Sequence, residues 1–403
     1  MSEKSFLDGK VFLHGGDCLE ILAAMPDNSV DSVVTDPPYH LTSIVKRFGK
    51  PGSAPAKEGL DGLFARSSRG FMGKEWDGGD IAFRPEFWAE VLRLLKPGGH
   101  LVAFAAAKNS HRMVCAIEDA GFEIRDGLQW MYGTGFPKNL DIAKALDKQS
   151  GVWRGRANTA MSGPNYERTD KGEPICDDAR KWDGWGTSLK PAYENICLAR
   201  KPLSEKTVAA NVLKWGTGAI NIDACRIEAE IATGWGGKAA GGNSWNNNTC
   251  GLSKQGVARP VNGRWPANIL HDRSEEVLAA FRSDDTTLSP ARFFFSAKAD
   301  NHDRIGSTHP TVKPIDLMQW LVRLITPKGG LVLDPFAGTG TTGEAAFREG
   351  MHAVLIEREP EYQADIARRM ALAIAGPDER ARESIKARGT ATSAGPLFDE
   401  VTE

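Results

Sequence analysis

A carboxylate followed by two prolines and a tyrosine, Asp36-Pro37-Pro38-Tyr39, stands one residue after the expected strand 30–34. The prolines fix the backbone and remove two N–H donors, which leaves carbonyl oxygens as acceptors beside the carboxylate. The tyrosine ring offers a flat face for stacking. Two acceptors and a stacking face suit the exocyclic amine of a nucleobase, which reaches such a pocket only after leaving the duplex stack. A surface turn with proline at its centre is the alternative interpretation.

A glycine pattern near the other end of the chain indicates a second site. Gly338, Gly340 and Gly343 satisfy G-x-G-x-x-G after the expected strand 331–334, and Glu357 stands at the end of the next expected strand. Glycines let a ligand approach the backbone at a helix N-terminus, and an acid about 20 residues on is placed to bind ribose hydroxyls. The segment therefore predicts an adenosine-cofactor site, with NAD left open on this segment alone. A tight turn with a surface acid is the alternative.

Alternating strands and helices must position these two sites. A helix, a Pro/Gly turn and a buried strand follow one another at 87–105, with the turn at 96–99, and again at 321–334. This repetition is typical of the two halves of a doubly wound α/β sheet. Further strands are expected at 11–13, 30–34, 293–295 and 352–356, and further helices from Asp17, which we expect to be an N-cap, and over 361–374.

Taken together, the motifs resemble the S-adenosylmethionine-dependent amino-group DNA methyltransferases in the permuted order called the beta group. The segment 35–39 matches the catalytic motif, 334–342 the cofactor loop, and 309–314 the segment upstream of that loop. The resemblance covers about 1–150 and 291–375, and it implies a Rossmann-like methyltransferase sheet. The phrases 189–191 and 264–268 look like a subset common in phages and prophages.

The resemblance also implies roles for individual residues. Asp36 and Pro37, within the motif that includes Pro38, would hold the target amine, and Tyr39 would stack on the flipped base. The cofactor-binding candidates are Asp17, Cys18, Thr311, Lys313, Asp334, Phe336, Gly338, Thr339, Gly340, Thr341 and Glu357. Among them Asp17 would lie near the adenine, Glu357 at the ribose, Gly338 and Gly340 at the methionine part, and Thr311 and Lys313 beside the carboxylate end. Lys313-Pro314 also fits a helix entry.

The predicted activity is methyl transfer to adenine N6 in double-stranded DNA, because a leading Asp in this family goes mostly with adenine. Cytosine N4 is the alternative, and the absence of any Pro-Cys dipeptide disfavours cytosine C5 chemistry. An NAD-dependent oxidoreductase is the rival from another enzyme class, but it leaves the Asp-Pro-Pro-Tyr motif unexplained. A homodimer and a cognate restriction nuclease are further partners that the resemblance allows.

Charge and composition suggest how the chain is divided. The net charge is −2, yet basic residues exceed acidic ones over 151–265, where seven of the 11 tryptophans lie. We therefore expect a catalytic half at 1–150 with a DNA-closing loop at 43–79, a loop-rich target-recognition region at 151–290, a cofactor-binding half at 291–375 and a solvated polar tail at 376–403.

Composition also indicates where the protein works. Six dilute cysteines and no apolar leader or membrane-length run predict a cytoplasmic protein without membrane contact. Eight scattered histidines give no support for a metal site.

Overall fold

The structure is a computed structural model. It describes residues 2–39, 80–133, 139–152, 173–227, 263–272 and 311–376, with short pieces between and after these ranges. The predicted loop 43–79 lies outside the described residues, as do long parts of the predicted recognition region and most of the tail.

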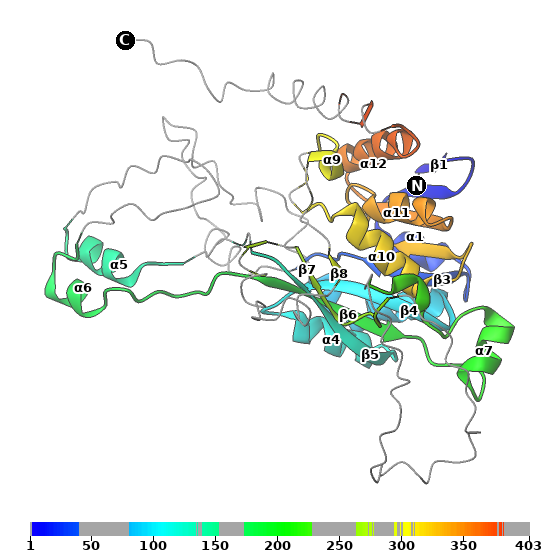
Figure 1. The fold of residues 1–403 in the computed structure, drawn as a ribbon, viewed down its shortest axis with the longest axis horizontal. Coiled ribbons are helices and arrows are strands. Elements are labelled where there is room, and N and C mark those ends of the chain that lie inside the picture. Colours follow the sequence, from blue (N-terminus) through cyan, green and yellow to red (C-terminus); the bar gives the residue numbers. More distant parts are fainter. Residues whose placement is uncertain are drawn as a thin grey trace, which may run out of the picture. The chain divides into compact units, whose positions relative to one another are not determined.

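The described strands form one ten-stranded sheet in the order β1-β2-β10-β9-β3-β4-β6-β5-β7-β8 (Figure 1). Five neighbouring strands at its centre run parallel to one another. They are β2 (Val11–Gly15), β10 (His352–Glu357), β9 (Leu331–Asp334), β3 (Val30–Thr35) and β4 (Leu95–Ala106). Beyond them lie β1 (Ser2–Phe6), β6 (Tyr193–Arg200), β5 (Glu123–Met131), β7 (Ile269–His271) and β8 (Phe294–Phe295).

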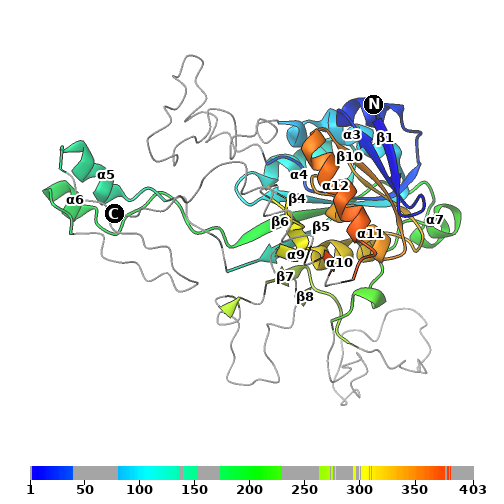
Figure 2. The same cartoon turned by 90° about the horizontal axis from the view of Figure 1, so that it is seen from above.

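Helices cover both faces of the sheet, as the two views show (Figures 1 and 2). One core lies under α1 (Cys18–Ala24), α3 (Pro85–Leu94) and α4 (Ser110–Asp119). The other lies under α10 (Ile315–Ile325), α11 (Thr341–Arg348) and α12 (Pro360–Leu372). Successive residues of a strand point to opposite faces, so Val33 joins the first core and Val34 the second. The predicted doubly wound α/β fold is confirmed.

The two halves of the sheet meet between β3 and β9, which pair in parallel. The first described α-helix after β3 is α3, which lies on one face, whereas the chain leaving β9 enters α11 on the other face. A crevice at the carboxyl ends of two such strands is the usual ligand position in open α/β sheets. The Asp-Pro-Pro-Tyr motif and the glycine loop therefore start side by side.

Two elements differ from the sequence expectation. The predicted turn 96–99 lies within β4, because Leu95 already pairs with Val30 and the register then shifts, with Ser32 pairing with His100. Gly98 lies in this irregular stretch and has a φ of 82°, a left-handed conformation of the kind that glycine provides in β-bulges. Strand β6 falls inside the range predicted as a loop-rich insert, yet it pairs with β4 and β5. The remaining described helices of the unit that contains the sheet are η2 (Ile81–Phe83), α7 (Val208–Trp215), η3 (Asp223–Cys225) and α9 (Asn301–Arg304).

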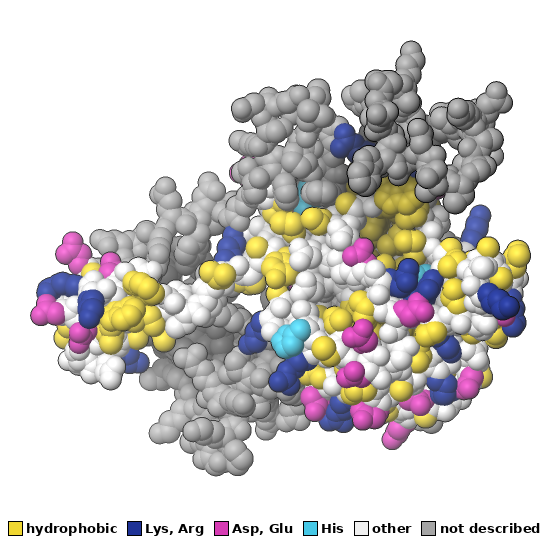
Figure 3. All heavy atoms as spheres, turned by 90° about the horizontal axis from the view of Figure 1, so that it is seen from below, with side chains coloured by type: hydrophobic (Ala, Val, Ile, Leu, Met, Phe, Trp, Pro, Cys, Tyr) yellow, Lys and Arg dark blue, Asp and Glu magenta, His cyan; other side chains and the backbone are white. Residues whose placement is uncertain are grey.

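Residues 133–192 form a separate compact unit, while 1–132 and 193–403 form the other. The small unit holds α5 (Ile142–Gln149) and α6 (Asp177–Lys181), joined by the buried carboxylate of Asp147, which accepts hydrogen bonds from the backbone N–H groups of Ile175 and Cys176. Trp182 and Trp185 pack edge to face and are exposed. Figure 3 shows hydrophobic side chains gathered on one face of the unit that holds α5 and α6. The predicted boundaries at 151 and 290 stay a prediction.

No helix in the described part of the chain is both long and apolar enough to cross a membrane.

Candidate active site

A buried hydrogen bond joins the strand that leads into the Asp-Pro-Pro-Tyr motif to the strand that leads into the glycine loop. Thr35, the last residue of β3, donates its hydroxyl to Oδ1 of Asp334, the last residue of β9, at 2.7 Å. Thr342 and the backbone N–H of Phe336 also donate to the Asp334 carboxylate. Asp334 therefore shapes the turn that follows it, and burial raises its pKa to about 6.

The glycine loop makes a tight turn into α11. Gly338 and Gly340 have φ values of 52° and 78°, in the left-handed region where a side chain is strained. The backbone N–H of Gly338 donates to Oε2 of Glu357 at 2.9 Å, so the acid predicted for the ribose lies against the loop. Burial raises the pKa of Glu357 to about 7, although the backbone N–H groups of Glu359 and Gly338 oppose the shift.

A charged cluster surrounds the carboxylate of the Asp-Pro-Pro-Tyr motif. The Lys313 ammonium lies 2.7 Å from Oδ2 of Asp36 and 3.0 Å from Oε2 of Glu194. It also donates to the Tyr39 hydroxyl at 3.1 Å, and that hydroxyl donates to Glu194 at 3.2 Å. The ammonium stands 4.7 Å from the ring centre of Phe104. Oδ1 of Asp36 is buried and has no hydrogen-bond partner among the described residues.

Burial and charge set the protonation of this cluster. Burial raises the pKa of Asp36, against the pull of Lys313. Burial would lower the pKa of Lys313, but the carboxylates of Asp36 and Glu194 outweigh it and raise that pKa. The pKa of Tyr39 lies well above its usual value because the ring is buried beside two carboxylates. Lys313 is therefore a permanent cation at this site.

Topology explains why Glu194 arrives here. Strand β6 runs antiparallel to β4, so its second residue, Glu194, pairs with Ala106 at the carboxyl end of β4. That end lies on the same edge of the sheet as Asp36. No sequence motif marks Glu194. Only an assignment of β6 as an antiparallel neighbour of β4 could have found it.

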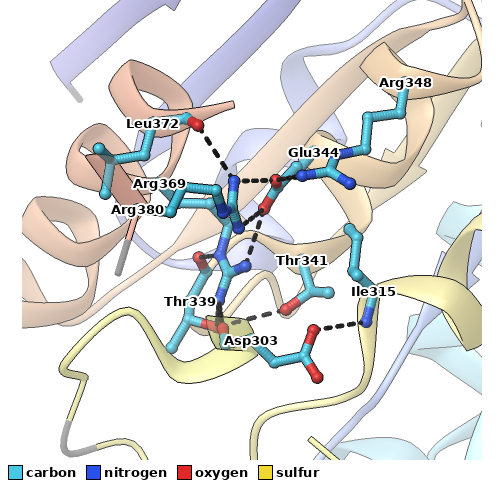
Figure 4. Close-up of polar contacts among 9 residues, drawn as sticks. All are labelled: Asp303, Ile315, Thr339, Thr341, Glu344, Arg348, Arg369, Leu372 and Arg380. Atoms are coloured by element: carbon cyan, nitrogen blue, oxygen red, sulfur yellow. Dashed lines mark hydrogen bonds and ion pairs between the residues drawn. The ribbon is translucent and has the colours of Figure 1, made fainter. Parts of the chain in front are cut away.

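A second buried network contacts the glycine loop through the backbone of Thr339 (Figure 4). Arg369 of α12 donates to the Thr339 carbonyl at 2.7 Å and pairs with Glu344 of α11 at 2.9 Å. Arg380 donates to the same Glu344 and to the carbonyl of Leu372. Arg380 is buried beside Glu344 although it lies within the stretch expected to be a solvated tail; most of that stretch lies outside the described residues, so the tail stays a prediction.

The remaining predicted residues fall in different places. Asp17 is the N-cap of α1 and accepts a hydrogen bond from the backbone N–H of Leu19 at 2.9 Å, as expected, and Cys18 is buried with its pKa raised to about 12. Thr339 and Thr341 are buried, and Phe336 packs against Phe87. Thr311 is exposed, whereas Lys313 forms an ion pair with Asp36.

The described residues contain no group of His, Cys, Asp or Glu side chains that could hold a metal ion.

These residues fit an adenosine cofactor. The carboxylate of Glu357, next to a turn that only glycine suits, can accept hydrogen bonds from hydroxyl groups. The turn opens helix α11, whose N-terminus favours negative groups. The buried acceptor Oδ1 of Asp36 lies across the Thr35–Asp334 link from this loop. One site for a nucleoside and one for a hydrogen-bond donor therefore meet at one edge of the sheet.

The fold and the candidate site fit an α/β protein that binds an adenosine cofactor. The sequence matches the DNA methylase family N6_N4_Mtase over residues 30–368, and the chain belongs to this family. This membership removes the oxidoreductase alternative.

Individual relatives are distant. The Type II methyltransferase M.HindIII of Haemophilus influenzae is 24% identical over 374 residues, which cover 86% of this chain and 90% of that protein. Among solved structures, the PvuII DNA methyltransferase (cytosine-N4-specific) is 15% identical, with a TM-score of 0.44 and coverage of 96% of this chain and 97% of that chain. The M1.HpyAVI–SAM complex is also 15% identical, with a TM-score of 0.39 and coverage of 89% and 98%.

Proposed function

We propose that this protein is a site-specific DNA methyltransferase that transfers a methyl group to the exocyclic N6 of adenine in double-stranded DNA. Its cofactor is S-adenosylmethionine. The observation that carries the proposal is the buried Oδ1 of Asp36, which has no hydrogen-bond partner within the part of the chain that the structure describes and whose motif starts beside the glycine loop. An acceptor left without a donor in a buried site costs free energy that an incoming N–H group recovers.

In the proposed reaction, different residues bind the target amine, the base and the cofactor. Asp36 Oδ1 and the carbonyl oxygens of the proline turn accept the two hydrogens of the target amine and hold its nitrogen in line. Tyr39 stacks on the base once it has left the helix. Gly338, Gly340 and Glu357 hold the cofactor, which supplies an electrophilic methyl group on a sulfonium sulfur when bound. The methylated nitrogen sheds one proton, and Asp36, whose pKa is raised by burial, can accept it at Oδ1.

The choice of adenine rests on Asp36 as the first residue of the motif, and cytosine N4 is the second candidate. Incubation with labelled cofactor and mixed DNA, followed by digestion to nucleosides, separates the two by the base that carries label. Methylation-sensitive sequencing of DNA from cells that express the protein then gives the recognition sequence.

Asp36→Asn tests the mechanism. The amide keeps the shape of the side chain but replaces one acceptor with a donor, so it clashes with the amine hydrogens. We expect methyl transfer to fall by about 100-fold or more, as for other groups that stabilise a transition state, while cofactor affinity stays near that of the wild type. Near-normal turnover in this variant would contradict the mechanism.

The predicted recognition region, the DNA-closing loop 43–79, the homodimer, the restriction nuclease, the beta-group assignment and the phage subset stay predictions.

A further inference from the structure

The Lys313 ammonium is fully engaged within the catalytic cluster. An ammonium has three N–H donors. The structure gives Lys313 three acceptors, at 2.7 Å (Asp36 Oδ2), 3.0 Å (Glu194 Oε2) and 3.1 Å (Tyr39 hydroxyl). In this arrangement no donor remains for the carboxylate end of a cofactor, the role that the family resemblance implies for Lys313.

The pair fixes which oxygen of Asp36 is available. Lys313 binds Oδ2, and Oδ1 is left buried without a partner among the described residues. Lys313 itself is only 7% exposed and is held from the other side by Glu194, which also accepts the Tyr39 hydroxyl. A side chain with one oxygen clamped cannot rotate its carboxylate freely, so Oδ1 keeps one direction.

We propose that Lys313 and Glu194 are positioning residues for Asp36, which clamp one carboxylate oxygen so that the other faces the target amine. This inference rests on the proposed function and assigns a role to Glu194 that the sequence did not indicate. In the cluster of Asp36, Glu194 and Lys313 two carboxyl groups face one ammonium, so acidic groups outnumber the basic one. An amine that donates hydrogen bonds complements these acidic groups, whereas a carboxylate would be repelled.

Lys313→Met is the first test, because methionine keeps most of the apolar stem and removes the charge. We expect kcat for methyl transfer to fall about 100-fold, the cost of misplacing a reacting group by about 1 Å, with cofactor Kd from calorimetry unchanged. A higher cofactor Kd together with an unchanged kcat would instead assign Lys313 to cofactor binding. Lys96→Met is the matched control, since Lys96 forms a 2.6 Å pair with Asp31 away from the site; its kcat should equal that of the wild type.

Glu194→Leu tests the other half of the clamp. The change releases Lys313 and the Tyr39 hydroxyl from one side, so kcat should fall while cofactor Kd stays constant. A wild-type kcat in this variant would overturn the role of Glu194.

The free protein supplies a readout that needs no activity. Asp36→Asn should lower the melting temperature in the wild type, where it removes a partner of the buried Lys313, but should be neutral or stabilising in the Lys313→Met background, where it neutralises a buried carboxylate that has lost its cation. Strictly additive effects of the two substitutions on the melting temperature would overturn the clamp.

The outcomes also separate the two proposals. If the wild type transfers no methyl group to DNA, the proposed function fails while the melting experiment still tests the clamp. If the wild type is active and Lys313→Met keeps its full kcat, the clamp alone fails.

Discussion

Lowering the pH from 8 to 6 should weaken cofactor binding through Glu357. Burial raises the pKa of its carboxyl to about 7 in the free protein. The ionised fraction then falls from about nine-tenths at pH 8 to about one-tenth at pH 6. If ribose hydroxyls bind the ionised form, the cofactor Kd should be about tenfold higher at pH 6 than at pH 8, because only the competent fraction binds.

Calorimetric titration with S-adenosylmethionine at several pH values measures this slope. Glu357→Gln is the control, since it keeps one acceptor oxygen but cannot ionise. Its cofactor Kd should be higher than that of the wild type at pH 8, and the part of the pH dependence of Kd that belongs to Glu357 should disappear. A slope of equal size in both proteins would belong to the ligand or to another group. That result, or a Kd that does not change between pH 8 and 6, would refute the reasoning.

The same pKa predicts the opposite trend for the stability of the free protein. A carboxyl whose folded pKa lies above its usual 4.5 stabilises the fold below that value and loses the contribution as pH rises through about 7. The whole contribution is about 3 kcal/mol, of which about 1 kcal/mol is lost between pH 6 and 8. Asp334, with a pKa of about 6, acts in the same direction. The melting temperature should therefore fall from pH 6 to pH 8, and by less in Glu357→Gln.

Two further changes test the support of the cofactor loop. Arg380→Ala removes charge-assisted hydrogen bonds to the buried Glu344 and should lower the free energy of unfolding by about 1–3 kcal/mol in urea, whereas the exposed neighbour change Arg382→Ala should have no effect; equal effects would mean that the buried contact contributes nothing. Gly340→Ala places a Cβ at a φ of 78° and 3.0 Å from Ile366, so it should cost about 1–3 kcal/mol and weaken cofactor binding. Wild-type stability and affinity in this variant would contradict the strained turn.

Local patterns predicted much of this fold because each rests on neighbours in the chain. The runs 30–34 and 331–334 became β3 and β9 of the parallel core, and the glycine loop adopted the positive φ values that its composition allows. Asp17 caps α1 as its spacing to Glu20 indicated. The prediction of a separate turn at 96–99 was wrong, because Leu95 already pairs with Val30 and β4 therefore begins before the Pro-Gly-Gly sequence.

The sequence by itself determined the two motifs, their order and the strands that carry them, because hydrophobic periodicity and glycine or proline stereochemistry act over a few residues. Only the tertiary structure decided which charges meet. Glu194 and Lys313 are 119 residues apart and reach Asp36 through the antiparallel placement of β6 and the entry to α10. Arg380 likewise finds Glu344 across 36 residues. Buried charges must be paired, but the partner is chosen by sheet order and helix packing, which no local pattern encodes.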